Sequence, residues 1–152
     1  MPGSQITTIV TNIATELDGV TGVQRVYTYE LVALAPGSIP TTMGSSQAID
    51  FWSVIPETSR PTRLQGYQME EDHTILFRHY YTAGDTSITT AALRTIILAV
   101  KDKFNNTFAV VPQAELTGPI EVTWPILWML AETFLTLKTE YRLPVKELYV
   151  TQ

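Results

Sequence analysis

The stretch that decides the fold reads His73-Thr74-Ile75-Leu76-Phe77-Arg78-His79-Tyr80-Tyr81, followed by Gly84-Asp85 and a segment that ends at Phe104. Aromatic and β-branched residues dominate its first part, which predicts a half-buried strand. In the second part apolar residues recur every three or four positions, the spacing of one face of a helix. That stripe comprises Leu93, Ile96, Ile97, Val100 and Phe104. We therefore expect a strand, a short turn and a helix.

The chain before this unit predicts one more helix and several strands. Residues 6–17 carry a helical stripe, with Ser4 as its N-cap and Gly19 as its end. Residues 23–31 alternate weakly, and residues 49–55 are apolar and aromatic, so both predict strands. We expect the second of these to end at Pro56. Residues 62–69 and 73–81 predict a hairpin that turns at Glu70-Glu71-Asp72.

The chain after the helix predicts more strands. Residues 114–122 predict a strand that is interrupted at Gly118-Pro119, and we expect Trp124-Pro125 to end it. Residues 129–140 alternate between apolar and polar side chains, which favours a strand, although one face would also fit a helix. Residues 144–152 predict a short C-terminal arm.

These elements predict one domain over residues 1–152. Its fold class is α+β, with two α-helices packed on one face of a mostly antiparallel β-sheet. Residues 35–47 interrupt it, since they are rich in Pro, Gly, Ser and Thr and show no periodicity. We predict a flexible loop there, either a docking element that uses Pro36, Ile39 and Met43 or a plain surface loop.

Composition excludes several classes of function. The net charge is −5 and no basic cluster forms, so the chain lacks the electrostatic footprint of a nucleic-acid-binding protein. Cysteine is absent, which excludes disulfides and thiolate metal sites. The apolar stretch over residues 125–131 is far shorter than a membrane helix, and the first residues lack the pattern of a signal peptide. Charged residues make up only 16%, which indicates either a surface covered by partners or a Thr-rich exposed surface.

Residues able to carry chemistry are few. His73 and His79 would lie on one face of a strand, about 20 Å apart, too far to share a metal ion. A metal site over residues 70–73 is conceivable, but a solvated hairpin turn is the favoured interpretation. Ser45 and Ser46 lack a nucleophile elbow, and Gly19-Val20-Thr21-Gly22 lacks the lysine of a phosphate-binding loop. We therefore expect no catalytic residue, no cofactor and no metal.

Apolar residues near the C-terminal end are candidates for an interface. Trp124 and Trp128 bracket the richest apolar cluster, which can anchor a partner or form a corner of the core. Val145, Leu148 and Val150 would lie in the C-terminal arm, which can add a strand to a neighbour's sheet. An alternative of a different class is a cytoplasmic ligand-binding or enzymatic α+β domain, with a pocket near Tyr27, Tyr29 and the segment 124–128.

The order of elements resembles the tail terminator proteins of long-tailed bacteriophages. The strand over residues 73–81 is similar to a family strand that reads His-Thr-Phe-x-Ile-Arg-Gly-Tyr-Tyr, with His79 in place of the Gly. The helix over residues 6–17, the helix over residues 91–104 and the final Ala-Glu-Thr-Leu-rich strand at residues 131–137 have similar counterparts. The resemblance covers roughly residues 6–142.

The resemblance implies a structural, non-enzymatic subunit of a ring, commonly a hexamer, at the head-proximal end of the tail of the virion, assembled in the host cytoplasm. Such a ring caps the tail tube, stops its polymerisation and offers a surface for head–tail joining. Its implied partners are other copies of the chain, the tail tube protein and a head–tail connector or neck protein, while DNA passes through unbound and no membrane takes part. Close alternatives are a neck or connector adaptor and a minor tail tube protein.

Overall fold

The computed structural model describes residues 3–29, 49–82, 86–106, 109–130 and 134–151. Within them the order is one helix, three strands, a second helix and four strands. The strands form one sheet whose pairings are antiparallel except between the first two strands. The α+β class and the mostly antiparallel sheet are therefore confirmed. The predicted loop over residues 35–47, with Pro36, Ile39 and Met43, lies outside the described residues.

Both predicted helices are present. Helix α1 spans Ile6–Asp18 and ends at Gly19, as its apolar stripe predicts. Helix α2 spans Thr86–Asn105 and carries Lys103 in its last turn, near the negative end of the helix dipole. The predicted N-cap at Ser4 is wrong, because α1 begins after Gln5 and the Ser4 hydroxyl donates a hydrogen bond to Glu147.

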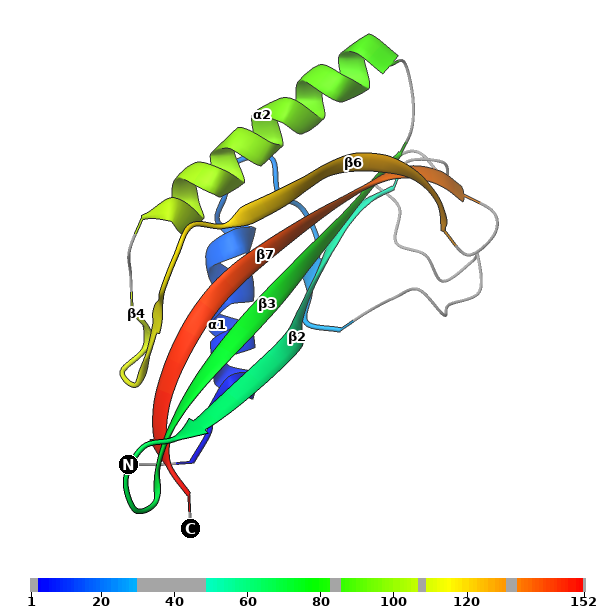
Figure 1. Ribbon diagram of the computed structural model, residues 1–152. Helices are drawn as coiled ribbons and strands as arrows, with labels where there is room; N and C mark the ends of the chain where they lie inside the picture. The colour runs from blue at the N-terminus through cyan, green and yellow to red at the C-terminus, as the bar shows by residue number, and fades with distance from the viewer. Residues whose placement is uncertain (1–2, 30–48, 83–85, 107–108, 131–133, 152) are drawn as a thin grey trace.

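Three long antiparallel strands form the centre of the sheet (Figure 1). They are β2 (Asp50–Arg63), β3 (Gln68–Thr82) and β7 (Phe134–Val150). The shorter strands are β1 (Val26–Tyr27), β4 (Ala109–Val111), β5 (Ala114–Leu116) and β6 (Glu121–Leu130). Beyond β7, the sheet continues as β5 and β4 along the C-terminal half of β7 and as β6 along its N-terminal half.

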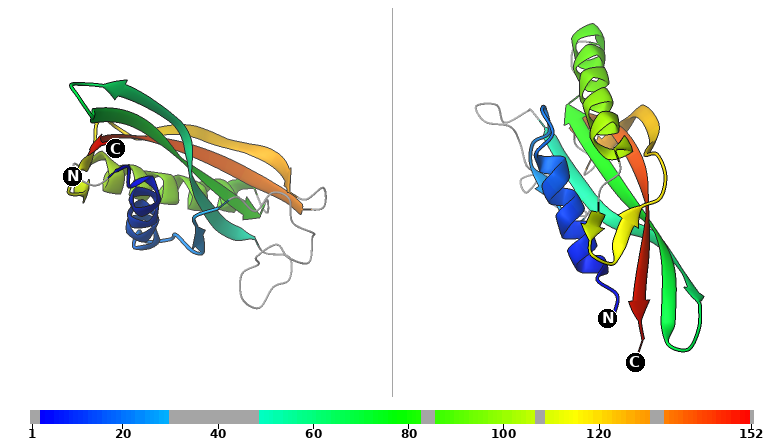
Figure 2. Two further views of the ribbon diagram at one scale, coloured as in Figure 1. Left: turned by 90° about the horizontal axis from the view of Figure 1, so that it is seen from below. Right: turned by 90° about the vertical axis from the view of Figure 1, so that its left-hand side faces the viewer.

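Side chains alternate between two faces of this sheet. We call the face that carries Trp52, Phe77 and Tyr141 the core-side face, because these residues belong to one hydrophobic core with buried residues of both helices. The helix residues in that core include Ile9, Ile13 and Leu17 of α1, and Ile97, Val100 and Phe104 of α2. We call the opposite face, which carries Arg78 and Glu140, the outer face. Figure 2 shows the long curved strands and the two helices from two further directions.

Two predicted strands in the first half of the chain have other boundaries in the structure. The strand predicted over residues 23–31 pairs only at Val26–Tyr27 within the described residues. Strand β2 does not end at Pro56, because a bulge there lets it continue to Arg63. Beyond Ser53, β2 has β3 as its neighbour and in the described residues no partner on the other side, and an edge tolerates proline because an unpaired N–H is not needed there.

The hairpin between β2 and β3 turns five to six residues earlier than predicted. Its turn lies at Leu64–Tyr67, where Gly66 has a φ of +62°, a conformation that glycine adopts without strain. The run Glu70-Glu71-Asp72 lies inside β3, so the prediction of a solvated hairpin turn there is wrong. The three adjacent acidic residues predict a turn at 70–72, but the turn forms at Gly66, which adopts the left-handed conformation.

Three corrections concern the second half of the chain. Strand β6 runs through Trp124-Pro125 with a bulge between Thr123 and Ile126. The strand predicted over residues 129–140 is instead the end of β6 and the start of β7, although strand rather than helix is confirmed in its described parts. Residues 144–150 are not a free arm, because they form the second half of β7 between β3 and β5.

Candidate interaction surface and a buried polar cluster

Strand β6 exposes a run of large apolar side chains. Trp124 is 54% exposed, Ile126 49%, Leu127 64% and Trp128 42%. Among the described strands β6 pairs only with β7, so its other edge is open within the part of the chain that the structure describes. Exposed apolar side chains on an open edge favour association with another chain. We refer to these four residues as the β6 surface.

The β6 surface extends to both faces of the sheet. Ile126 and Trp128 pair with Lys138 and Thr136, on the outer face. The Lys138 ammonium lies 3.5 Å from the centre of the Trp128 ring, a cation–π contact that holds this indole in place. Leu127 pairs with Leu137, on the core-side face.

A groove lies between β6 and α2. It has a volume of about 160 Å³ and is lined by Thr90, Leu93, Arg94, Ile97, Trp124, Pro125 and Leu137. Pockets that bind small molecules usually measure about 300–1,000 Å³, so this groove is small for a ligand. Neither Tyr27 nor Tyr29 lines it; these two rings contact each other at 5.5 Å instead. This groove is therefore not the pocket predicted near the tyrosines and the segment 124–128.

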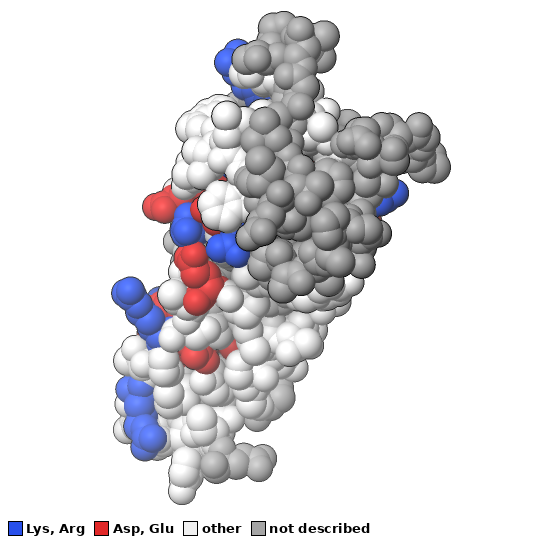
Figure 3. All heavy atoms as spheres, turned by 90° about the vertical axis from the view of Figure 1, so that its right-hand side faces the viewer, with Lys and Arg blue, Asp and Glu red and all other residues white. Residues whose placement is uncertain are grey.

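The outer face pairs its own charges. Arg78 donates to Glu140 at 2.9 Å, Arg142 binds Glu57 through two hydrogen bonds of 2.9 and 3.0 Å, and Lys146 lies 3.1 Å from Glu70. Figure 3 shows acidic and basic side chains side by side in a column on the molecule. Because these charges are already paired, the outer face offers no strong field of one sign to a charged partner.

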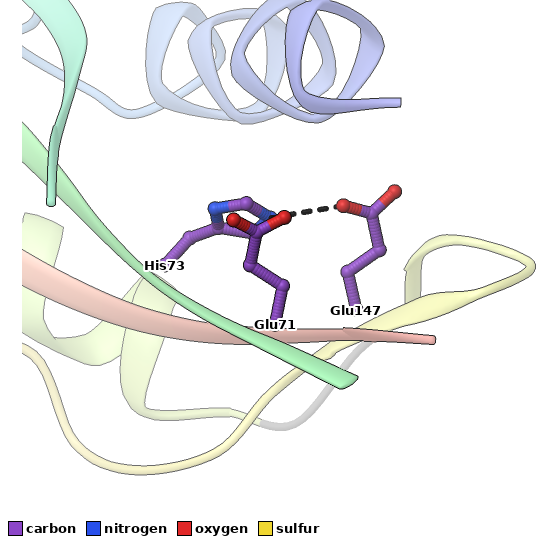
Figure 4. A group of neighbouring side chains, drawn as sticks. All are labelled: Glu71, His73 and Glu147. Carbon is purple, nitrogen blue, oxygen red and sulfur yellow. Dashed lines mark hydrogen bonds and ion pairs between the residues drawn. The ribbon is translucent and has the colours of Figure 1, made fainter. Parts of the chain in front are cut away.

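At the end of the sheet opposite to the β6 surface, three side chains that can bind metals meet (Figure 4). They are Glu71 and His73 of β3 and Glu147 of β7, and their ligand atoms all lie within 4.8 Å of one another. The side chains of His73 and Glu147 are 1% and 0% exposed, and that of Glu71 is 13% exposed. His73 Nε2 lies 2.9 Å from Glu147 Oε1 and 4.0 Å from Glu71 Oε1.

Glu147 also fixes the N-terminal segment to the sheet. Its carboxylate accepts hydrogen bonds from the Ser4 hydroxyl at 2.9 Å, the Gln5 backbone N–H at 2.6 Å and the Gln113 amide at 2.7 Å. Burial alone would raise the pKa of Glu147, but these bonds and the one with His73 lower it below its ordinary value. The carboxylate is therefore held in its ionised form.

Two further contacts surround the cluster. The Ser59 hydroxyl lies 2.7 Å from His73 Nδ1, on the side of the ring away from Glu147. The Tyr149 hydroxyl donates to Glu71 Oε1 at 2.8 Å. Burial and this bond raise the pKa of Tyr149 to about 12, because the carboxylate stabilises the protonated phenol.

A second buried histidine lies in the core. His79 Nε2 lies 2.7 Å from Asp50 Oδ1, and the ring stacks on Trp52 at 4.0 Å. Burial lowers the pKa of His79, and the contacts with Asp50 only partly offset it, so the ring is neutral at pH 7. His79 Nδ1 and the nearby Trp52 Nε1 and Tyr141 hydroxyl have no hydrogen-bond partner among the described residues.

The predicted interface residues fall in different places. Trp124 and Trp128 are together on the β6 surface. Val145 is buried in the core, Leu148 is exposed and Val150 is half-buried, all within β7. None of the three lies in a free arm, because β7 pairs with β3 as far as Val150 and with β5 at Val145.

Sequence reasoning did not identify Glu147. The signal was present, because Tyr141, Leu143 and Val145 set an alternation that continues to position 147. A carboxylate at a position where the pattern expects an apolar residue indicates a buried polar role. Its partner His73 is 74 residues away, so only the pairing of β3 with β7 brings them together.

Comparison with models of known protein families found no match, and comparison with curated proteins also found none. None of the described helices has the length and the apolar character needed to span a membrane.

Proposed function

We propose that this chain is a non-enzymatic structural protein that assembles with copies of itself through the β6 surface, as a ring subunit of the phage tail terminator type. The observation that carries the proposal is the exposure of four large apolar side chains within five residues of an open edge strand. Such an edge promotes uncontrolled association unless a specific neighbour covers it.

Side-chain packing, rather than backbone pairing, is the expected contact. Pro125 has no N–H to donate, and the bulge between Thr123 and Ile126 interrupts the edge. A continuous added strand is therefore disfavoured on β6. Trp124 and Trp128 instead offer the large, rigid contact area that dominates the energetics of interfaces.

We also infer that α1 and α2 cover the core-side face together and leave the outer face to solvent or to assembly. The shared hydrophobic core of both helices supports this arrangement. In it, β6 and the adjoining α2 form one side of the subunit. A ring needs two different surfaces that fit each other, so this side would meet another part of the neighbouring copy.

In the proposed ring the further partners are the tail tube protein on one side and a head–tail connector protein on the other, at the head-proximal end of the tail. The net charge of −5 supports a channel through which DNA passes, because an acidic subunit does not retain phosphate groups.

Sedimentation velocity and native mass spectrometry of the full chain test the proposal. We expect a closed oligomer for the unmodified chain and a monomer for Leu127→Lys, since a charge in the β6 surface opposes burial there. The matched control is Leu64→Lys in the β2–β3 hairpin, which is similarly exposed and should leave the oligomer unchanged.

Two results would reject the proposal. One is a monomer at every concentration up to the solubility limit. The other is an oligomer that persists unchanged in Leu127→Lys while Leu64→Lys dissociates it, which would move the interface to the hairpin.

A further inference from the structure

Besides any role in assembly, the cluster of Glu71, His73 and Glu147 has the composition of a metal site. Glu71 and Glu147 are direct neighbours across β3 and β7, and His73 lies two residues along β3 on the same face. Figure 4 shows the three side chains converging from the two strands. We propose that these residues bind one divalent transition-metal ion, with Zn²⁺ the best-suited ion, through His73 Nε2 and one oxygen of each carboxylate.

The distances suit such an ion after small side-chain shifts. Two ligands at about 2.05 Å from a tetrahedral Zn²⁺ lie about 3.3 Å apart. His73 Nε2 lies 2.9 Å from one carboxylate oxygen and 4.0 Å from the other. The two pairs that include His73 therefore need to change their separation by less than about 1 Å. The two carboxylate oxygens lie within 4.8 Å of each other and need to approach by about 1.5 Å at most, which rotation of the glutamate side chains provides.

The hydrogen bonds of Glu147 leave the necessary coordination position. A carboxylate offers about four acceptor positions. Ser4, Gln5 and Gln113 occupy three of them, and the fourth faces His73 Nε2. A metal ion would replace only the proton between His73 and Glu147, while the three bonds to the N-terminal segment and Gln113 remain. Glu71 Oε1 keeps its bond from Tyr149 and has a second acceptor position for the ion.

Ser59 allows His73 to become a ligand. A hydroxyl either donates or accepts, so it can pair with His73 Nδ1 in both neutral tautomers of the ring. With the proton on Nδ1, donated to Ser59, the lone pair of Nε2 is free for a metal. Such a hydrogen bond behind the imidazole is the usual support of a histidine ligand.

The charge balance provides an independent argument for a cation. Two nearly buried carboxylates lie beside one histidine, and within the described residues neither is paired with Lys or Arg. Buried negative charge without a cation is costly even when neutral donors surround it. A dication would neutralise the pair, and the imidazole selects against Mg²⁺ and Ca²⁺, which prefer oxygen ligands.

Isothermal titration calorimetry and thermal unfolding of the tag-free full chain, freed of metal with a chelator, test the site. We expect one Zn²⁺ per chain and a rise in Tm of several degrees, with no comparable effect of Mg²⁺ or Ca²⁺. Bound Co²⁺ should show the visible absorption of a low-coordinate site. Affinity should fall as pH decreases, because the ion competes with protons for the ligands.

The decisive variant is Glu71→Gln, with Glu70→Gln as its matched control. Glu71 is the least buried ligand and its amide substitute can still accept from Tyr149, so this variant should fold. We expect Glu71→Gln to weaken Zn²⁺ binding at least tenfold and to change the Co²⁺ spectrum, and Glu70→Gln, whose residue pairs with Lys146 on the outer face, to do neither.

Equal binding by both variants, or no stoichiometric binding at all, would overturn the proposal. These outcomes are separate from the proposed assembly, because the cluster and the β6 surface lie at opposite ends of β7. A Leu127→Lys monomer that still binds Zn²⁺ would support the metal site whatever becomes of the ring.

Discussion

The two ends of β7 differ in what they bury. At the N-terminal end, β6 lies alongside it as an open edge, and Trp124, Leu127 and Trp128 are exposed. At the C-terminal end, β7 lies between β3 and β5, and His73 and Glu147 are buried. Apolar side chains are thus exposed at one end and ionisable ones are buried at the other. A strand's position in the sheet, rather than its composition, determines this burial.

The difference has an energetic consequence. A buried polar group must keep all its partners, because each unsatisfied donor or acceptor is costly. An exposed apolar side chain on an edge loses little when it is replaced in the isolated chain. Substitutions at the Glu147 end should therefore destabilise the subunit, and substitutions on β6 should mainly change its association.

The largest effect is expected for Glu147→Ala. The change leaves the donors of Gln5 and Gln113 and the imidazole of His73 without their acceptor. We expect the free energy of unfolding to decrease by about 3 kcal/mol, the range for a broken buried polar network. Urea unfolding followed by circular dichroism measures it. Glu115→Ala, an exposed carboxylate on β5, should change it by less than about 0.5 kcal/mol.

A decrease of less than about 1 kcal/mol in the free energy of unfolding of Glu147→Ala would contradict the expected difference between the two ends of β7. It would mean that solvent reaches the C-terminal end of β7 and replaces the missing acceptor.

Much of the fold could be predicted from periodicity. Both helices and the strand over residues 73–81 follow from apolar spacing, because a long regular pattern outweighs a few exceptions. The wrongly predicted strand ends lie at prolines. Pro56 and Pro125 both lie within strands, at bulges near open edges, and a single sequence does not show which strands form the edges.

The sites were less predictable than the fold. Trp124 and Trp128 could be named from composition, but their exposure depends on β6 having no strand beyond it in the described sheet. The Glu147 cluster needed the register of β3 against β7, and the misplaced turn at residues 70–72 concealed it. A contact between residues far apart in sequence is fixed by strand pairing, which local patterns do not encode.

A smaller effect, on the pH dependence of stability, is expected from His79. Its pKa in the folded chain lies below the unfolded value of 6.5, so the unfolded chain binds more protons between the two values. Stability should therefore be full above pH 6.5 and decrease as pH falls toward the folded pKa, by at most about 1.4 kcal/mol per pH unit for one proton.

The matched variant is His79→Gln, which keeps an N–H donor for Asp50 but cannot titrate in this range. Urea unfolding at pH 8, 7, 6 and 5 should show a flatter dependence in this variant. Glu147 adds a separate decrease with the same sign at lower pH, because its lowered pKa gives stability that is lost below about its unfolded value of 4.5. If the free energy of unfolding of His79→Gln depends on pH as steeply as that of the unmodified chain, the decrease below pH 6.5 belongs to another group.

The smallest effect is expected on β6. Lys138 is almost buried on the outer face, and its ammonium lies over the Trp128 ring at 3.5 Å. In monomeric chains, Trp128→Leu should cost about 1 kcal/mol or less, since Trp128 is already 42% exposed and leucine keeps part of its apolar contact. A double-mutant cycle with Lys138→Met should give a coupling energy of about 0.5–1 kcal/mol. A coupling of several kcal/mol would show that Trp128 belongs to the core of the subunit, and the β6 surface would then lose one of its two anchors for a neighbouring copy.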